Sequence, residues 1–191
     1  MLAFRRLAWV LGVLAVLAVV TTSAAALVIR RPAPLLLRLH GAGLSASVTG
    51  AGWRMVPADH QIGYRSGPRV RAPAVYREDW CARADHSSRA FAGFVATGGR
   101  SVREIARRWA AAISRDPRTG RLVAPVDLVV GDHRRADADL DVPTGPCNPP
   151  RDHLTVVVAG EEALVLVRDV GVEDALPATA AEAIVRSLRW R

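Results

Sequence analysis

Three aspartates that alternate along one short stretch come nearest to the spacing of a metal site. Asp137, Asp139 and Asp141 lie in the segment ADADLDV and would share one face of a β-strand, because strand side chains two residues apart point the same way. The stretch does not match a calcium-binding EF-hand loop, since Val142 stands where the turn needs Gly and Asn148 stands at the last ligand position. We therefore interpret the three carboxylates as a solvated strand face. They are kept only as candidates for a cation, and we expect no metal or other cofactor.

The histidines give no independent support to catalysis. Four of the five directly follow an aspartate, and neighbouring strand residues point to opposite faces, so these dipeptides do not orient an imidazole. The sequence also lacks the GxSxG, HExxH and SxxK patterns and the Gly-rich phosphate loops that position a nucleophile, a metal or a phosphate. These observations predict that the protein is not an enzyme. The alternative is a cation-dependent hydrolase that uses Asp137, Asp139 and Asp141.

Arginines cluster in the middle of the chain, where a helix is expected. Arg103, Arg107 and Arg108 fall on the side of that helix that faces away from its apolar residues. Such a face could dock on an anionic surface, either phospholipid headgroups or a wall polymer. The plainer interpretation is a solvated helix back, because the chain uses Arg for every basic residue.

The net charge of +8 does not predict a nucleic-acid partner. Four of the 26 basic residues and none of the 18 acidic ones lie in residues 1–31, so half of the basic excess flanks a candidate membrane segment. For an exported domain, the anionic partners are lipid headgroups and wall polymers.

The two cysteines predict one disulfide. Cys81 and Cys147 both lie in the globular part, and an even count in an exported protein is typical of a structural bond. No CxxC pattern and no suitable His spacing indicates a zinc site instead. The bond would close a loop of about 66 residues and contribute roughly 4 kcal/mol through chain entropy.

An uncharged stretch near the amino terminus determines where we expect the globular part of the chain to be located in the cell. Residues 7–29 carry no charge and, as a helix, would extend about 34 Å, enough to cross a hydrocarbon core of about 30 Å. We predict a cytoplasmic tail over 1–6, a transmembrane signal anchor over 7–29, a juxtamembrane linker over 30–51 and an extracytoplasmic domain over 52–191. The alternative is a signal peptide cut near residues 24–26, followed by secretion. The predicted location is therefore the cell membrane, with a single span and the domain outside, or the medium.

Two helices are expected in the domain. Apolar residues at helical spacing predict an amphipathic helix over 101–113, and Ser101 with Glu104 forms a capping box at its start. A second helix is predicted near the carboxyl end, where Thr179 and Glu182 repeat the capping-box pattern.

Alternating apolar residues predict two β-hairpins between these helices. Residues 121–130 pair with 136–142, and residues 154–159 pair with 163–169 across a Gly-containing turn. Because hairpins give antiparallel pairing, the expected fold class is α+β: an N-terminal transmembrane helix, then a mainly antiparallel sheet with both helices packed on it.

Several segments of the domain resemble those of a known family. They are AVYREDWC, RAFAGF, GPCNPP, DVGVEDALP and IVRSLR. Residues 52–191 are thereby similar to an actinobacterial family of exported, membrane-anchored domains of unknown function. The resemblance implies a PsbP-like α/β arrangement, also seen in LpqN-type mycobacterial lipoproteins, and transfers no catalytic residues. Unlike those lipoproteins, this chain has no lipid-accepting Cys. We expect a non-catalytic binding or accessory protein of the cell envelope, with an envelope protein or a small ligand as partner.

Overall fold

The structure, a computed structural model, describes residues 36–57, 61–63, 67–83 and 87–190. These residues belong to the unit Leu35–Arg191, and the fold described here is that of this unit. The predicted transmembrane segment, residues 7–29, lies outside the described residues. Within them, no helix is long and apolar enough to cross a membrane. The predicted fold class, which began with a spanning helix, is therefore wrong for the described chain.

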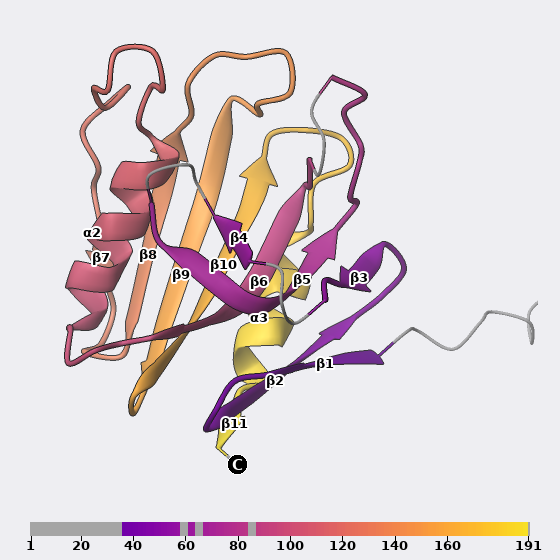
Figure 1. The fold of residues 1–191 in the computed structure, drawn as a ribbon, viewed down its shortest axis with the longest axis vertical. Helices are drawn as coiled ribbons and strands as arrows, with labels where there is room; N and C mark the ends of the chain where they lie inside the picture. The colour runs from indigo at the N-terminus through magenta and orange to yellow at the C-terminus, as the bar shows by residue number, and fades with distance from the viewer. Residues whose placement is uncertain (1–35, 58–60, 64–66, 84–86, 191) are drawn as a thin grey trace, which may run out of the picture. The chain divides into compact units, whose positions relative to one another are not determined.

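Two antiparallel sheets and two helices make up the described fold (Figure 1). The larger sheet has the order β3-β5-β6-β10-β9-β8-β7, and β4 pairs with β5. The smaller sheet has the order β1-β2-β11. The strands of the larger sheet are β3 (Trp53–Met55), β4 (Gln61–Gly63), β5 (Arg69–Tyr76), β6 (Ala90–Ala96), β7 (Val129–Val130), β8 (Arg135–Asp141), β9 (Arg151–Ala159) and β10 (Glu162–Val170). The remaining elements are β1 (Leu36–His40), β2 (Leu44–Thr49), β11 (Arg189–Trp190), α2 (Val102–Ile113) and α3 (Ala178–Arg186).

Helix α2 covers one face of the larger sheet and contacts β8 and β9 (Figure 1). Its buried residues are Val102, Ile105, Ala106, Trp109, Ala110 and Ile113, which is the apolar face that the sequence predicts. The predicted capping box is present, with Ser101 as the N-cap and the Glu104 carboxylate accepting from the Ser101 backbone N–H at 2.8 Å. Glu104 thereby satisfies one of the helix's unpaired N–H groups.

The predicted hairpins form to different extents. Strands β9 and β10 pair along their whole lengths, from Glu162 opposite Ala159 to Val170 opposite Arg151. In the other hairpin, only β7 pairs with β8, and residues 121–128 are not a strand. Pro125 lies in that segment and has no N–H to donate to a ladder, which is a physical reason for its irregular path.

The other face of the larger sheet is covered by α3 and the smaller sheet. Leu164 and Leu166 of β10 are buried there in one core with Leu44 of β2 and Ile184 of α3. The two helices therefore lie in different cores, on opposite faces of the sheet, rather than together on one surface. The expectation that both helices pack on a mainly antiparallel sheet is confirmed, and the smaller sheet is an addition that the sequence did not predict.

The predicted linker over residues 30–51 contains part of this layer. Residues 36–40 and 44–49 form strands β1 and β2, which pair from Leu36 opposite Thr49 to His40 opposite Ser45. In β2 the buried residues Leu44, Ala46 and Val48 alternate with half-buried Ser45 and Ser47, so a period of two was present in the sequence. The Gly- and Ser-rich composition of the segment obscured it.

Helix α3 begins differently from the prediction. Its N-cap is Pro177, which makes no side-chain cap, and the expected capping box of Thr179 and Glu182 does not form. The Glu182 carboxylate instead pairs with Arg135 of β8 at 3.0 Å. The ion pair ties α3 to the face of the larger sheet on which the helix lies.

Candidate functional site

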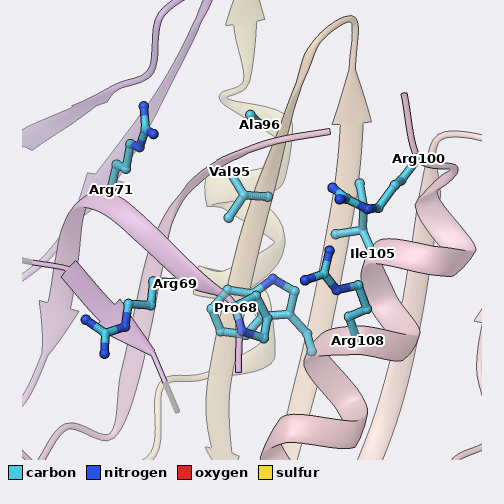
Figure 2. A pocket seen from close by; sticks show the side chains of 9 residues that line it. Pro68, Arg69, Arg71, Val95, Ala96, Arg100, Ile105 and Arg108 are labelled. Carbon is cyan, nitrogen blue, oxygen red and sulfur yellow. The ribbon is translucent and has the colours of Figure 1, made fainter. Parts of the chain in front are cut away.

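A groove lies between helix α2 and the adjoining ends of β5 and β6 (Figure 2). Its cavity volume is about 180 Å³. It is lined by Pro68, Arg69, Arg71, Val95, Ala96, Arg100, Ile105, Arg108 and Trp109. Four of these nine residues are arginines and none is acidic, and we call the site the cationic groove.

The apolar part of the cationic groove belongs to the core. Ile105 is 4% exposed and Trp109 is 1% exposed, and the Trp109 ring packs on Phe91 with 5.8 Å between the ring centroids. The indole Nε1 of Trp109 is buried and has no hydrogen-bond partner among the described residues.

Arg100 and Arg108 reach into the cationic groove from the helix side. In Figure 2 their guanidinium groups are directed toward Val95 of β6. Arg100 is oriented by a hydrogen bond that its Nη1 donates to the Thr97 carbonyl at 3.1 Å. Gly98 adopts a φ of +56°, which places the chain in the left-handed region at the turn before α2. The turn and the helix together bring two guanidinium groups to one cavity.

Arg69 and Arg71 form the opposite wall of the cationic groove. They are two residues apart on β5 and therefore lie on the same side of that strand. Figure 2 shows their guanidinium groups directed away from Arg100 and Arg108. A register shift between Arg71 and Ala74 interrupts the pairing of β5 with β6, so the side-chain alternation changes just beyond this wall.

Some arginines elsewhere in the fold have carboxylate partners, whereas the lining of the cationic groove contains no acidic residue. Arg89 pairs with Asp169 at 2.9 Å, Arg151 with Asp141 at 3.2 Å, and Arg135 with two carboxylates. In the described part of the chain, none of the four groove arginines has an ion pair with a carboxylate. The two guanidinium groups that point into the cavity, those of Arg100 and Arg108, produce a positive potential that attracts anions.

The nearest acidic side chain on α2 is already engaged. Hydrogen bonds from the Ser101 backbone and hydroxyl hold the pKa of Glu104 below its usual value, and the nearby charges of Arg100 and Arg107 act in the same direction. The Glu104 carboxylate therefore caps the helix and does not line the groove.

The structure places one of the three arginines predicted as a docking face in the groove and leaves the other two outside it. Arg103, Arg107 and Arg108 are all exposed on α2, as the helical spacing predicted. Only Arg108 lines the cationic groove. The other three groove arginines were not predicted, although Arg69 and Arg71 have strand spacing and Arg100 follows a Gly-Gly turn. Those local signals do not reveal that β5 and α2 meet.

The predicted aspartate face is an ion-pair cluster. Ala136, Ala138 and Leu140 of β8 are buried toward α2, and the three aspartates lie on the opposite face, as predicted. Arg135 donates to Asp137 at 2.8 Å, Arg151 donates to Asp141 at 3.2 Å, and His153 Nδ1 lies 2.6 Å from Asp139. Among the described residues, no group of three or more His, Cys, Asp or Glu side chains could hold a metal ion.

The pKa shifts in this cluster follow from its contacts. Burial favours the protonated form of Asp137, but hydrogen bonds from His153, Arg135 and Thr155 outweigh it and hold the pKa of Asp137 well below its usual range. The hydrogen bond to Asp137 is the main cause that raises the pKa of His153, and the contact with Asp139 adds to it. His153 therefore lies between two carboxylates of the cluster, those of Asp137 and Asp139.

The predicted disulfide is confirmed. Cys81 and Cys147 are bonded to each other, and the bond joins the loop after β5 to the loop between β8 and β9. Beside it, the guanidinium group of Arg89 lies 3.5 Å from the ring centroid of Trp80. The two loops are separated by β6 and β10 in the sheet order, so the bond ties distant strands of the larger sheet together.

The fold and the groove define an α+β domain with two antiparallel sheets, one disulfide and a cationic cavity. Residues 47–191 match the model of a family described as a domain of unknown function (DUF8017), and the chain belongs to this family. The match begins inside β2, upstream of the predicted domain boundary at residue 52. No curated protein matches the chain.

Proposed function

We propose that the domain is a non-catalytic, extracytoplasmic binding module of the cell envelope that takes an anionic ligand in the cationic groove. The observation that carries the proposal is the pair Arg100 and Arg108, whose guanidinium groups both point into the groove and, among the described residues, have no carboxylate partner. A bound anion would supply the missing countercharge.

The chemistry of the groove favours phosphate or carboxylate as the anion. A guanidinium group presents parallel N–H donors that match two oxygens of either group. Arg100 is held in place by Thr97, so less side-chain freedom is lost when it binds. The cavity volume of about 180 Å³ suits one such group with a small neighbouring moiety rather than a large apolar ligand.

An extracytoplasmic location is supported by the disulfide between Cys81 and Cys147, because structural disulfides persist in oxidising compartments. The non-catalytic part of the proposal is supported by the lining of the cationic groove. It contains positive charges and hydrogen-bond donors but no nucleophile or base. The aspartates that would serve the alternative hydrolase are paired with Arg135, His153 and Arg151, so they favour a structural role.

The test compares two double variants with the same change in charge. Arg100→Gln with Arg108→Gln removes the two guanidinium groups that point into the groove. Arg103→Gln with Arg107→Gln removes two exposed charges of helix α2 that do not line it. Tripolyphosphate binding is measured by calorimetry at low and high salt. We expect the groove variant to bind at least tenfold more weakly than the wild type, since it loses two charge-assisted contacts.

The matched control distinguishes anion binding at the groove from attraction by the overall positive charge of the surface. We expect the Arg103 and Arg107 variant to stay within about twofold of the wild type, because screened surface charges contribute little at physiological salt. Equal losses in both variants, or wild-type protein that does not bind tripolyphosphate, would overturn the cationic groove as a binding site.

A further inference from the structure

A second groove lies on the opposite face of the larger sheet from the cationic groove. Buried Leu44 of β2 and Phe94 of β6 line it, and both belong to the core that contains α3. Ile105 and Trp109 of the cationic groove belong to the core that contains α2. The cavity volume is about 520 Å³, within the range of about 300–1,000 Å³ that is usual for small-molecule sites. We call this separate site the aromatic groove.

Trp190 of β11 lines the aromatic groove and remains open to solvent. The residue is 65% exposed, although the groove that it lines has a buried apolar floor. Its backbone pairs with Leu44 of β2, and its ring lies against the β9–β10 turn, where a Cβ added at Gly160 would lie 2.9 Å from Trp190 Cζ3. Gly160 also has a φ of +58°, so both the conformation and the close approach favour glycine there. The strand and the turn therefore hold one open aromatic ring at the groove.

The turns that border the aromatic groove are hydrogen-bonded within the fold. The Glu162 carboxylate accepts from three successive backbone N–H groups, those of residues 42–44, at 2.8, 2.8 and 3.1 Å. The backbone carbonyl of Glu161 accepts from the Thr97 N–H at 2.8 Å. The walls are thus in place before a ligand binds, which reduces the entropy that binding costs.

Two exposed side chains of opposite charge line the aromatic groove, Arg71 and Glu161. Arg71 is opposite Phe94 in the pairing of β5 with β6, so it lies on the sheet face that bears the groove. Its guanidinium group and the Glu161 carboxylate balance each other, and the charge of Glu162 is stabilised by the N–H groups of the turn. Such a lining favours a neutral ligand with groups that both donate and accept hydrogen bonds.

We infer that the aromatic groove binds a neutral saccharide, a ligand of a different class from the anion proposed for the cationic groove. A pyranose ring has a face of C–H bonds that stacks on an aromatic ring, and its hydroxyl groups donate and accept hydrogen bonds. Trp190 supplies the ring, Glu161 an acceptor and Arg71 donors. At about 520 Å³, the cavity has room for a short oligosaccharide.

The experiment measures the binding of three neutral trisaccharides, maltotriose, cellotriose and chitotriose, to the full chain by calorimetry. The protein is kept in a detergent whose head group is not a sugar, so that the detergent does not compete. Adenine is the comparison ligand, because it can stack on an aromatic ring but has no hydroxyl groups. Tryptophan fluorescence is recorded as well, since a sugar on the open ring of Trp190 changes its contact with water.

We expect at least one trisaccharide to bind with a Kd below about 1 mM and more tightly than adenine. Trp190→Ala should weaken that binding about tenfold, whereas Trp190→Phe should retain most of the affinity and lose the fluorescence change. Glu161→Gln should weaken binding about threefold through the loss of a charged acceptor.

Leu122→Ala is the matched control, because it truncates a side chain that is 43% exposed and does not line the aromatic groove. It should bind the trisaccharide like the wild type. Unfolding midpoints show which variants are folded, and Glu161→Gln, at an exposed position, provides the test if Trp190→Ala does not fold.

The saccharide inference is overturned if no trisaccharide binds with a Kd below about 1 mM, or if Trp190→Ala and Leu122→Ala lose affinity equally. Adenine that binds more tightly than every trisaccharide would also overturn it. Tripolyphosphate binding should be the same in Trp190→Ala and in the wild type, because the cationic groove lies on the other face of the sheet. The proposed anion site therefore stands or fails separately.

Discussion

Arg89 and Asp169 form an ion pair that is almost completely removed from solvent. Their side chains are 13% and 7% exposed, and the Asp169 backbone N–H also donates to the Arg89 carbonyl at 2.8 Å. Burial of the carboxyl group outweighs the nearby guanidinium and raises the pKa of Asp169 to about 6. A buried charge that is costly to desolvate and paired by one contact makes the domain sensitive to pH at this residue.

The raised pKa predicts that stability falls as the pH rises through this range. Between a pKa of about 3.8 in the unfolded chain and about 6 in the folded one, the native state binds the extra proton. The contribution is therefore complete below about pH 4 and lost above about pH 6. We expect Asp169→Asn to remove a stability change of about 3 kcal/mol across that interval, measured as the free energy of unfolding in urea at a series of pH values.

Asp174→Asn is the control for the Asp169 experiment. Asp174 pairs with Arg77 at 3.2 Å, but both side chains are about half exposed, so the substitution removes the same charge at a solvated position. We expect its pH profile to parallel that of the wild type. An Asp169→Asn profile that also runs parallel to the wild type would contradict the assignment of this slope to Asp169.

At the level of elements, Glu162 connects the two sheets. It lies at the start of β10 in the larger sheet, and its carboxylate receives three N–H groups from the turn that leads into β2 of the smaller sheet. Gly41 at this turn leaves no space for a side chain, because an added Cβ would lie 2.5 Å from the Glu162 carboxylate. The turn is therefore built around that one acidic group.

We expect Glu162→Gln to destabilise the domain by about 2 kcal/mol, since a neutral amide cannot accept three N–H groups as a carboxylate does. Its neighbour Glu161 is exposed, and Glu161→Gln should change stability by less than about 0.5 kcal/mol. Urea unfolding curves of both variants measure the difference. Equal effects of the two substitutions would show that the turn does not depend on this carboxylate.

The elements differ in how far the sequence could predict them. Helix α2 and strand β8 have strong periodicity and carry their own signals, Ser101 with Glu104 in one and alternating Asp and Ala in the other. Strands β1 and β2 gain their stability from a core supplied by α3 and β10, which no local pattern reveals. The cationic groove could not be predicted from the sequence for the same reason, because it forms where β5 and α2 come together in the fold.

At the scale of the whole molecule, the Cys81–Cys147 bond constrains the larger sheet across its width. It links the loop after β5 to the loop before β9, with the intervening strands β6 and β10 between them in the sheet order. Arg89 packs on Trp80 beside this bond and pairs with Asp169 of β10, so the bond and the buried ion pair support the same end of the sheet.

Reduction of this bond should cost the domain about 4 kcal/mol of stability, because the unfolded chain regains the freedom of a 66-residue loop. The measurement is guanidinium unfolding of the wild type with and without reductant. The variant Cys81→Ser with Cys147→Ser serves as the control, and it should match the reduced wild type and be unaffected by reductant. A loss of this size is a large share of the 5–15 kcal/mol typical of a domain.

A domain that needs this bond to stay folded depends on an oxidising compartment. Alkylation of thiols in intact cells should therefore find both cysteines blocked. Free thiols in the cell, or equal stability of the two redox states, would contradict the proposed location.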